Sequence, residues 1–378
     1  FKSLLVAPAT LGLLAPMSAT ANEVTISDFS PAEQIAVTNS RVDGLEARMN
    51  VMEAGGFSET TTASFSVDTV IGAVDGGNDS TEAVTFDYQM GIGLSTSFTG
   101  EDSLDITIDV GGGSDDTSVT QTEANQIMGY DNTSGKMVVD GITYTFPLGG
   151  ATVVVGDTTD ISSTFTGACT YSAFTDATPD DCGTKNSLGK GGNGVTASIG
   201  YAFDSGFSLA GGVSSTETAI MTKEGTDTYG IEAAYTADTY GVAVAYVSVD
   251  NAAAAETTYW GVNAFYDFDL ASISVGVETE ETSGVDESGY FVGLSFPEVG
   301  PGSVNLALAT QENYKDSESE YLIYEASYSY PLNDGMTITP GVYIKEATTS
   351  GADDDTGVLV KTCLLYTSPS PRDVEESR

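Results

Sequence analysis

The sequence contains no histidine, and proline, tryptophan, cysteine and basic residues are scarce. Among 378 residues there are 11 prolines, 1 tryptophan, 3 cysteines and 12 lysines and arginines. Without histidine, His-dependent catalytic triads and histidine-ligated zinc are excluded. Three cysteines are too few for a disulfide-built fold of this size. The 55 acidic residues give a net charge of −43, which excludes a nucleic-acid-binding surface of clustered lysine and arginine.

The residues that are present favour an ordered, all-β protein. Apolar residues make up 40% of the chain and aromatic residues 9%, which is too rich for wholesale disorder. Glycine is abundant, with 43 residues, and tyrosine contributes 19. This composition is unlike that of an ordinary cytosolic enzyme and points to strands that face water or a membrane.

The first residues predict export from the cytoplasm. Residues 1–21 read as a secretory signal peptide, with Lys2 as a short basic region, an apolar stretch over 3–17 and an A-x-A cleavage site at 19–21. Beyond it, no run approaches the ~18 to 20 apolar residues that a spanning helix needs. If the chain enters a membrane, we therefore expect a closed barrel.

Residues 22–56 are expected to form a periplasmic segment that holds one short coiled-coil helix. The helix is predicted from Pro31 to Ala54, ended by Gly55 and Gly56. An amphipathic helix packed on its own domain is the alternative, and the strict spacing of seven favours self-association. The two core positions of the heptad are Ile35, Val42 and Met49, and Thr38, Leu45 and Met52.

From residue 58 onward the hydrophobic period becomes 2, which predicts strands. Over 84–98 one face is apolar and the other carries polar and small residues, and the segments 229–235, 240–246 and 258–268 repeat this pattern. Aliphatic residues lie in the middle of these segments and aromatic residues near their ends. Aromatic residues at both borders of an outward face are typical of strands that cross a membrane.

Sixteen such segments can be counted in residues 57–362, joined alternately by tight turns and by longer, acidic loops. An even number of strands with short turns at one rim and long loops at the other is the layout of a bacterial outer-membrane barrel. We therefore predict an all-β fold, a 16-stranded antiparallel transmembrane β-barrel preceded by the coiled-coil helix. The longest connection, Asp157 to Gly192, follows the fifth strand and is the third outer loop.

The junction between helix and barrel resembles cyanobacterial outer-membrane porins, the family related to carbohydrate-selective porins and often labelled iron-uptake porins. The similarity rests on the export signal, the short coil ending in LEAR and MEA at 45–48 and 52–54, and FSETTT at 57–62, and it extends over roughly 24–362. It implies a trimer in the bacterial outer membrane.

The last residues do not continue the barrel pattern. From Cys363 the sequence reads CLLYTSPSPRDVEESR, with two prolines and no alternation. This stretch resembles translated adapter sequence that contaminates some metagenomic assemblies. We expect residues 363–378 to be a non-native tail outside the barrel.

The strand face opposite the apolar one is expected to line the lumen, and it is acidic. Residues 58–362 contain no arginine, so the wall lacks the arginine cluster of general porins. The expected lumen is a negative field that attracts cations. The residues predicted to line the pore and set its selectivity are Asp68, Asp87, Asp105, Asp109, Glu232, Glu278 and Glu325, against Lys345 and Lys361.

The third outer loop is predicted either to constrict the pore or to cap it. It holds Cys169 and Cys182, the only cysteines before the tail, and in an exported chain these favour a disulfide over metal ligation. A disulfide favours a loop of defined shape. The charged residues of this candidate constriction loop are Asp157, Asp160, Asp176, Asp180, Asp181, Lys185 and Lys190.

Other chemistry finds little support. The acidic runs at 111–116 and Asp353 to Asp355 are candidate sites for divalent cations, but they lack the ligand spacing of a calcium loop, which favours solvated outer loops. There is no nucleophile elbow, so no catalytic residue and no cofactor are expected.

We therefore expect a passive, weakly cation-selective porin for small hydrophilic solutes and ions. Its expected partners are outer-membrane lipid and two further copies of the chain. One alternative is a channel for sugars, with inward Phe291, Tyr321 and Tyr343 as platforms, or for iron species. Another, from a different class, is a structural envelope tether or adhesin.

Overall fold

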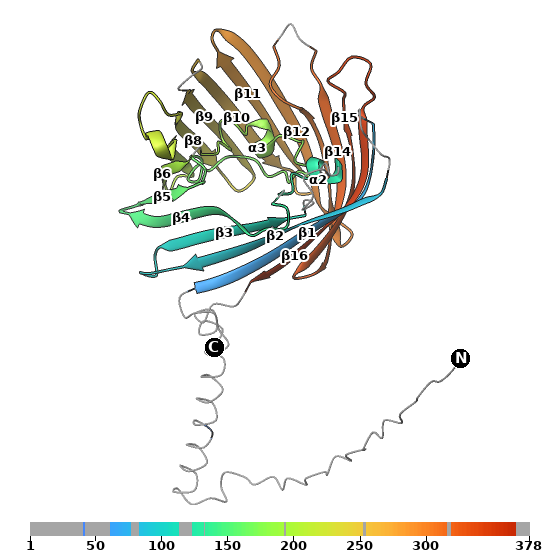
Figure 1. Ribbon diagram of the computed structural model, residues 1–378, viewed down its shortest axis with the longest axis horizontal. Coiled ribbons are helices and arrows are strands. Elements are labelled where there is room, and N and C mark those ends of the chain that lie inside the picture. The colour runs from blue at the N-terminus through green and yellow to red at the C-terminus, as the bar shows by residue number, and fades with distance from the viewer. Residues whose placement is uncertain are drawn as a thin grey trace, which may run out of the picture. The chain divides into compact units, whose positions relative to one another are not determined.

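The computed structural model describes residues 41, 61–76, 83–112, 123–131, 133–192, 194–251, 255–315 and 319–367. Sixteen strands form one closed barrel (Figure 1). They are β1 Thr61–Asp75, β2 Thr85–Thr96, β3 Ser103–Gly111, β4 Val138–Leu148, β5 Ala151–Asp157, β6 Val195–Ala202, β7 Phe207–Ser215, β8 Asp227–Thr236, β9 Tyr240–Asp250, β10 Thr257–Asp267, β11 Ser272–Thr282, β12 Val285–Val299, β13 Gly302–Thr310, β14 Leu322–Asn333, β15 Met336–Lys345 and β16 Asp355–Thr367.

Each strand pairs antiparallel with its neighbours in the chain, and the barrel closes where β1 pairs with β16, as in Val67 opposite Leu364. The predicted 16-stranded antiparallel barrel is confirmed. Within the described residues, three short helical segments lie between strands, namely α2 Glu123–Ile127, α3 Asp180–Gly183 and the 3₁₀ turn η2 Glu217–Ala219. None of the helices in the described ranges has the length and hydrophobicity that a membrane-spanning helix requires.

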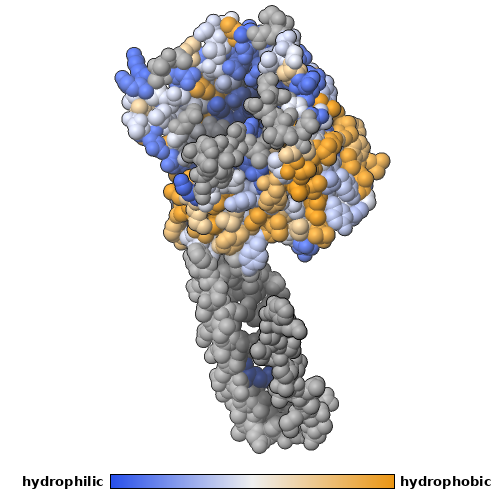
Figure 2. Space-filling model, turned by 45° about the vertical axis from the view of Figure 1, so that its right-hand side comes forward, coloured by the Kyte–Doolittle hydropathy of each residue, from blue (hydrophilic) through white to orange (hydrophobic). Residues whose placement is uncertain are grey.

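The alternating sequence produces the two faces of the wall. In β9, Val242 and Val244 are exposed on the outer face, whereas Ala243, Ala245 and Val247 are buried on the inner face. Successive side chains of a strand point to opposite faces, so one period-2 pattern fixes the orientation of the whole strand. The outer wall consequently carries a band of hydrophobic residues, and a polar hollow opens at one end (Figure 2).

Aromatic side chains form groups of ring contacts along the rim with the short turns. Tyr144 and Phe146 have ring centroids 5.5 Å apart, and Tyr201 and Phe203 have theirs 4.7 Å apart. Ring pairs at such distances contribute beyond their buried area. The same rim carries the pairs Phe98–Tyr144, Phe207–Tyr235, Tyr235–Tyr240 and Tyr266–Phe268.

The last strand is longer than the sequence indicated. β16 runs to Thr367, and Cys363 pairs with Asp68 of β1 and with Thr337 of β15. The expectation that the barrel ends at residue 362 is therefore wrong for residues 363–367. The stretch CLLYT is apolar enough to complete the ladder, and the prolines follow only after it. Residues 368–378 lie outside the described residues.

The N-terminal part forms a separate compact unit, residues 1–56. Of this unit only Arg41 is described, and it is helical. The predicted signal peptide at 1–21 and the heptad core positions therefore lie outside the described residues. They remain predictions.

Candidate pore constriction

The connection after β5 folds into the barrel and does not cap it. Its described residues 158–192, here called loop L3, carry α3, which contacts the inner faces of β10, β11 and β12. Figure 1 shows α3 inside the barrel, enclosed by its wall. Of the two arrangements left open by the sequence, the structure has the constriction. Sequence-predicted Cys169 and Cys182 form a disulfide bond in L3, 13 residues apart.

One inward carboxylate binds the disulfide-closed part of L3. Glu325 of β14 is 4% exposed and accepts hydrogen bonds from the backbone N–H groups of Phe174 and Thr175, at 2.8 and 3.0 Å. It also accepts bonds from the hydroxyls of Tyr171, Thr175 and Thr178, at 2.9, 3.0 and 2.8 Å. Hydrogen bonds to a charged group are worth about 1.5–3 kcal/mol each. This single side chain therefore fixes L3 to the wall.

A second carboxylate binds the far end of L3. Glu278 of β11 is 1% exposed and accepts hydrogen bonds from the backbone and side-chain nitrogens of Asn186, at 3.1 and 3.0 Å. The hydroxyl of Ser187 donates to it at 2.6 Å. Next to Glu278, on β10, Asn263 accepts from the N–H of Ala168 at 2.7 Å. L3 is thus attached to the wall at several points along its length.

The same contacts correct the predicted roles of the inward acids. The strands do place Asp87, Glu232, Glu278 and Glu325 on the inner face, but all four are buried, at 7%, 3%, 1% and 4% exposure. Glu232 lies beneath L3 and accepts a hydrogen bond from the N–H of Thr166 at 3.2 Å. Buried carboxylates that accept loop hydrogen bonds do not line open water, so Glu232, Glu278 and Glu325 hold the constriction and are not its surface.

L3 meets a second inward loop, which the sequence did not reveal. The backbone oxygen of Ile127, in the β3–β4 connection, accepts a hydrogen bond from Asp176 of L3 at 2.9 Å. The two loops and the wall also share a buried apolar cluster, and burial of each valine, leucine, isoleucine, phenylalanine or methionine side chain stabilises the fold by about 1.5–3 kcal/mol. The cluster contains Val70, Val74, Ala124, Ile127, Met128, Tyr130, Phe174, Tyr343 and Leu359.

Two of the three aromatic residues considered as sugar platforms are covered. Tyr343 is 2% exposed within that cluster. Phe291 is 1% exposed and packs edge-on against Tyr171 of L3, with ring centroids 5.2 Å apart. Tyr321 remains partly exposed and contacts Tyr314 at 5.8 Å. Phe291 and Tyr343 are therefore not available as sugar platforms, because L3 and the second loop cover them.

The exposed face of L3 is acidic. Asp160, Asp180 and Asp181 line a cavity of about 440 Å³ together with serine and threonine side chains. Partial burial raises the pKa of Asp181, and the charge of Asp160 raises it further. Burial likewise raises the pKa of Asp160, with the charge of Asp140 as the second cause. Three of the predicted loop acids thus converge on one surface.

The β3–β4 wall is also acidic, and its Asp140 lies close enough to Asp160 to raise the pKa of that residue. Asp109 of β3 is inward, and Asp140 of β4 accepts a hydrogen bond from the inward hydroxyl of Thr107 at 3.3 Å. Asp140 is the extra residue of a β-bulge between the pairs Thr107–Gly141 and Ile108–Val139. Bulges re-aim side chains, which explains why strict alternation missed Asp140. Burial and the charge of Asp140 raise the pKa of Asp131, in the second loop.

The two loop lysines lie beside the β10–β13 wall. Lys185 lines a different cavity, of about 370 Å³, with Glu280 and Glu312. The Lys190 ammonium lies 5.4 Å from the ring centroid of Tyr259. Burial lowers the pKa of Lys190, and the nearby Glu278 and Glu280 charges oppose that shift. Both lysines therefore lie beside the β10–β13 wall, and the Lys185 charge lowers the pKa of Asp180 against the larger effect of burial.

The remaining predicted residues are more dispersed. Asp68 accepts a hydrogen bond from Gln89 at 3.4 Å, and Asp105 accepts one from Ser103 at 2.7 Å. In the strand register, Lys345 of β15 lies opposite Asp355 of β16 near the long-loop rim, and Lys361 of β16 lies opposite Val70 of β1. Exposed Asp176 lies against Gly129 of the second loop. A Cβ atom at position 129 would lie 2.4 Å from the carboxyl carbon of Asp176, so the contact leaves no room for a side chain there.

Asp157 does not belong to the constriction. It is the last residue of β5 and has the outward parity of Val153 and exposed Val155. A hydrogen bond with Asp157 raises the pKa of Glu217, and the like charge adds to the shift. The prediction took Asp157 as the first residue of the loop. It was wrong because β5 extends through Asp157, whose side chain therefore follows the alternation of the strand and points outward.

Within the described ranges, no group of three or more cysteine and acidic side chains is arranged to hold a metal ion. Asp353 to Asp355 are described and form no such group. Much of the run at 111–116 lies outside the described residues.

We expect cation preference to weaken on acidification at a higher pH than ordinary aspartates would allow. Burial and like charges raise the pKa of Asp160 and of Asp181 above the ordinary value of 3.8. Protonation therefore removes their negative charge while the pH is still above 3.8. Reversal potentials in a KCl gradient, recorded during acidification, should show a midpoint above 3.8. A midpoint at or below it would contradict the assignment.

Comparison with known proteins shows the fold. No protein-family profile matches the sequence, and no curated protein matches it. Pseudomonas putida OprB superposes with a TM-score of 0.64 at 11% identity over 86% of this chain and 97% of its own. A loop L8 deletion mutant of OmpT, an outer membrane protein of Vibrio cholerae, gives 0.57 at 12% over 81% and 100%. A mutant porin of Rh. blastica gives 0.52 at 14% over 81% and 100%. The chain therefore has the 16-stranded barrel fold of bacterial outer-membrane porins.

Proposed function

We propose that the protein is a porin of the bacterial outer membrane, a passive diffusion channel for small hydrophilic solutes and inorganic ions with a weak preference for cations. The observation that carries the proposal is the acidic constriction, where Asp160, Asp180 and Asp181 line one cavity on L3 and the charge of Asp140 on β4 acts on Asp160. Negative charge on both sides raises the local concentration of cations and repels small anions.

The outer surface supports the membrane location. Large aliphatic residues are exposed on the outward face of many strands, among them Ile231, Val262 and Val358 at 63%, 44% and 62% exposure. In water such a band would drive aggregation, whereas in a bilayer it meets hydrocarbon. We propose no catalytic residue and no cofactor. The similarity of residues 45–62 to cyanobacterial porins supports a place for the chain in that family.

The channel is tested by reconstitution into a planar bilayer. We expect stepwise increases of conductance, each step marking one inserted channel. An envelope tether or adhesin, the alternative of another class, would insert without conductance. The sugar- or iron-selective channel has less support, because L3 covers Phe291 and Tyr343.

We propose further that three copies associate, assisted by the heptad helix predicted from Pro31 to Ala54. Replacing Val42, Leu45 and Met49 by aspartate places three charges at core positions of the coil. The barrel should still fold, and the oligomer should dissociate at a lower temperature in heated detergent samples. Three aspartates in place of exposed heptad residues are the control. An unchanged dissociation temperature would show that the helix does not assist assembly.

A further inference from the structure

The main chain of L3 touches the barrel wall directly beside Asp181. The backbone oxygen of Cys182, the next residue, lies against Gly276 of β11, where a Cβ would be 1.8 Å from that oxygen. Gly276 faces inward, because it lies between buried Ser274 and buried Glu278 on an alternating strand. The absence of a side chain at position 276 is therefore what lets this part of L3 lie so close to the wall.

The same kind of contact is found beside Asp160. The backbone oxygen of Ile161, the next residue, lies against Gly212 of β7, where a Cβ would be 2.1 Å from that oxygen. Gly212 is buried on the inner face of the strand, and Ile161 is completely buried. Asp160 and Asp181 both line the acidic cavity of the constriction. Two of its carboxylates are thus each one residue away from a backbone contact with an inward glycine.

A side chain at either glycine would displace L3 and leave the wall in place. A carbon atom and a carbonyl oxygen in contact are about 3.3 Å apart, so L3 would have to move by roughly 1.5 Å at Gly276 and roughly 1.2 Å at Gly212. β11 pairs with β10 and β12, and β7 pairs with β6 and β8, so neither strand can move outward alone. The hydrogen bonds of Glu325 to residues 171–178 keep the loop attached.

We propose that Gly212 and Gly276 are positioning residues of the constriction, which set the distance of Asp160 and Asp181 from the ion path and thereby the size limit and the cation preference of the pore. The proposal rests on the porin function proposed above and names two residues that adjust it. A displaced L3 carries both carboxylates toward the lumen. The opening then narrows, and ions pass closer to negative charge, whose attraction increases as the distance falls.

The test is single-channel recording of Gly212→Ala and Gly276→Ala. At high salt, where screening weakens the field, each variant should pass less current per conductance step and exclude smaller polyethylene glycols than the wild type. At low salt, the reversal potential in a KCl gradient should shift further toward K⁺. A loop that merely came loose would do the opposite, because the pore would widen and lose its cation preference. A step at or above the wild-type value, or an unchanged reversal potential, in either folded variant would overturn the proposal.

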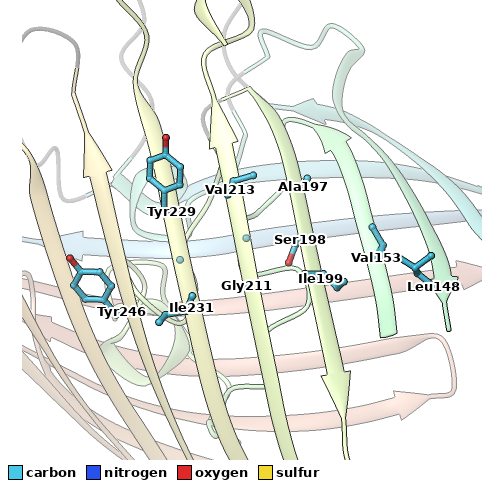
Figure 3. Close-up of a pocket in the computed structure, with 12 residues that line it drawn as sticks. Leu148, Val153, Ala197, Ser198, Ile199, Gly211, Val213, Tyr229, Ile231 and Tyr246 are labelled. Carbon is cyan, nitrogen blue, oxygen red and sulfur yellow. The ribbon is translucent and has the colours of Figure 1, made fainter. Parts of the chain in front are cut away.

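The matched control is Gly211→Ala, one residue away on the same strand. Gly211 lies on the outer face of β7, and Figure 3 shows it among Ile199, Val213 and Ile231. A Cβ there would be 3.5 Å from its nearest atom, the oxygen of Gly230, which is an ordinary contact distance. The control adds the same methyl group to the same strand without touching L3. Its conductance, size limit and reversal potential should equal those of the wild type.

A milder variant with a rescue tests the positioning even where neither alanine variant folds. A Cβ at Gly230 of β8 would lie 2.9 Å from Cδ1 of Ile161, the end of the side chain that follows Asp160. Gly230→Ala should reduce the conductance step less than Gly212→Ala does. Adding Ile161→Val removes Cδ1 and should restore the step toward the wild-type value. No reduction in Gly230→Ala, or no recovery in the double variant, would overturn the proposal.

Failure of this proposal is distinguishable from failure of the proposed channel. A wild type that conducts, with steps that the inward alanines leave unchanged, would retain the porin and reject the role of the glycines. A folded wild type that gives no conductance steps would reject the channel itself.

Discussion

Replacing Glu325 by glutamine is expected to raise single-channel conductance and current noise, because it releases the disulfide-closed part of L3 from the wall. One carboxylate oxygen accepts from Tyr171 and Phe174, and the other accepts from Thr175 and Thr178. An amide group turns one of these positions into a donor that faces other donors. With hydrogen bonds to charge worth about 1.5–3 kcal/mol each, loss of two favours release by more than tenfold, since 1.4 kcal/mol is about a factor of ten.

The control is Glu281→Gln. It removes the same charge from an exposed residue at the end of β11 and touches no part of L3. Conductance steps of the two variants should be compared at the same salt concentration. A Glu325→Gln channel with wild-type steps and wild-type noise would show that the carboxylate does not position the loop. Each variant is also run on a gel before and after heating. A variant whose barrel fails to fold would be recognised because heating no longer changes its migration.

Neutralising the constriction is expected to abolish most of the cation preference. The triple variant Asp140→Asn, Asp160→Asn and Asp181→Asn removes charge from both sides and retains hydrogen-bonding side chains. Asparagine also tolerates the left-handed backbone of Asp181, whose φ is 51°. A unit charge ~4 Å from an ion is worth ~1 kcal/mol in bulk water, which is roughly a fivefold change in ion population per charge.

The matched control neutralises three aspartates in the short turns, Asp204, Asp238 and Asp269. These residues are exposed at the opposite rim, so the net charge changes equally while the constriction does not. The permeability ratio of K⁺ to Cl⁻ should fall severalfold in the first variant and little in the second. The difference should shrink at high salt because screening weakens the field. Equal effects in both variants would place the selectivity elsewhere.

The barrel was predictable from the sequence because strand alternation is a local signal. A period of 2 over β9 or β10 fixes which side chains face outward without any knowledge of the partner strands. The same signal failed at the ends of strands. Asp157 was assigned to a loop, and residues 363–367 were assigned to a tail, since neither pairing partners nor strand length can be read from one segment.

The direction of the inward acids was predictable, but their surroundings were not. Parity places Glu278 and Glu325 inside the barrel, and only the path of L3 shows that backbone N–H groups cover them. Backbone donors leave no trace in a sequence. The bulge that turns Asp140 inward is equally hidden, because it breaks the alternation on which the interpretation depended. For these two reasons the sequence placed the site on the regular barrel wall, whereas the structure places it where L3 lies near β3 and β4.

The most direct test of the account is the reversal potential of the wild-type channel in a tenfold KCl gradient. An acidic constriction on both L3 and the β3–β4 wall predicts a potential with the sign of K⁺ permeation, larger at low salt than at high salt. A reversal potential with the sign of Cl⁻ permeation would contradict it.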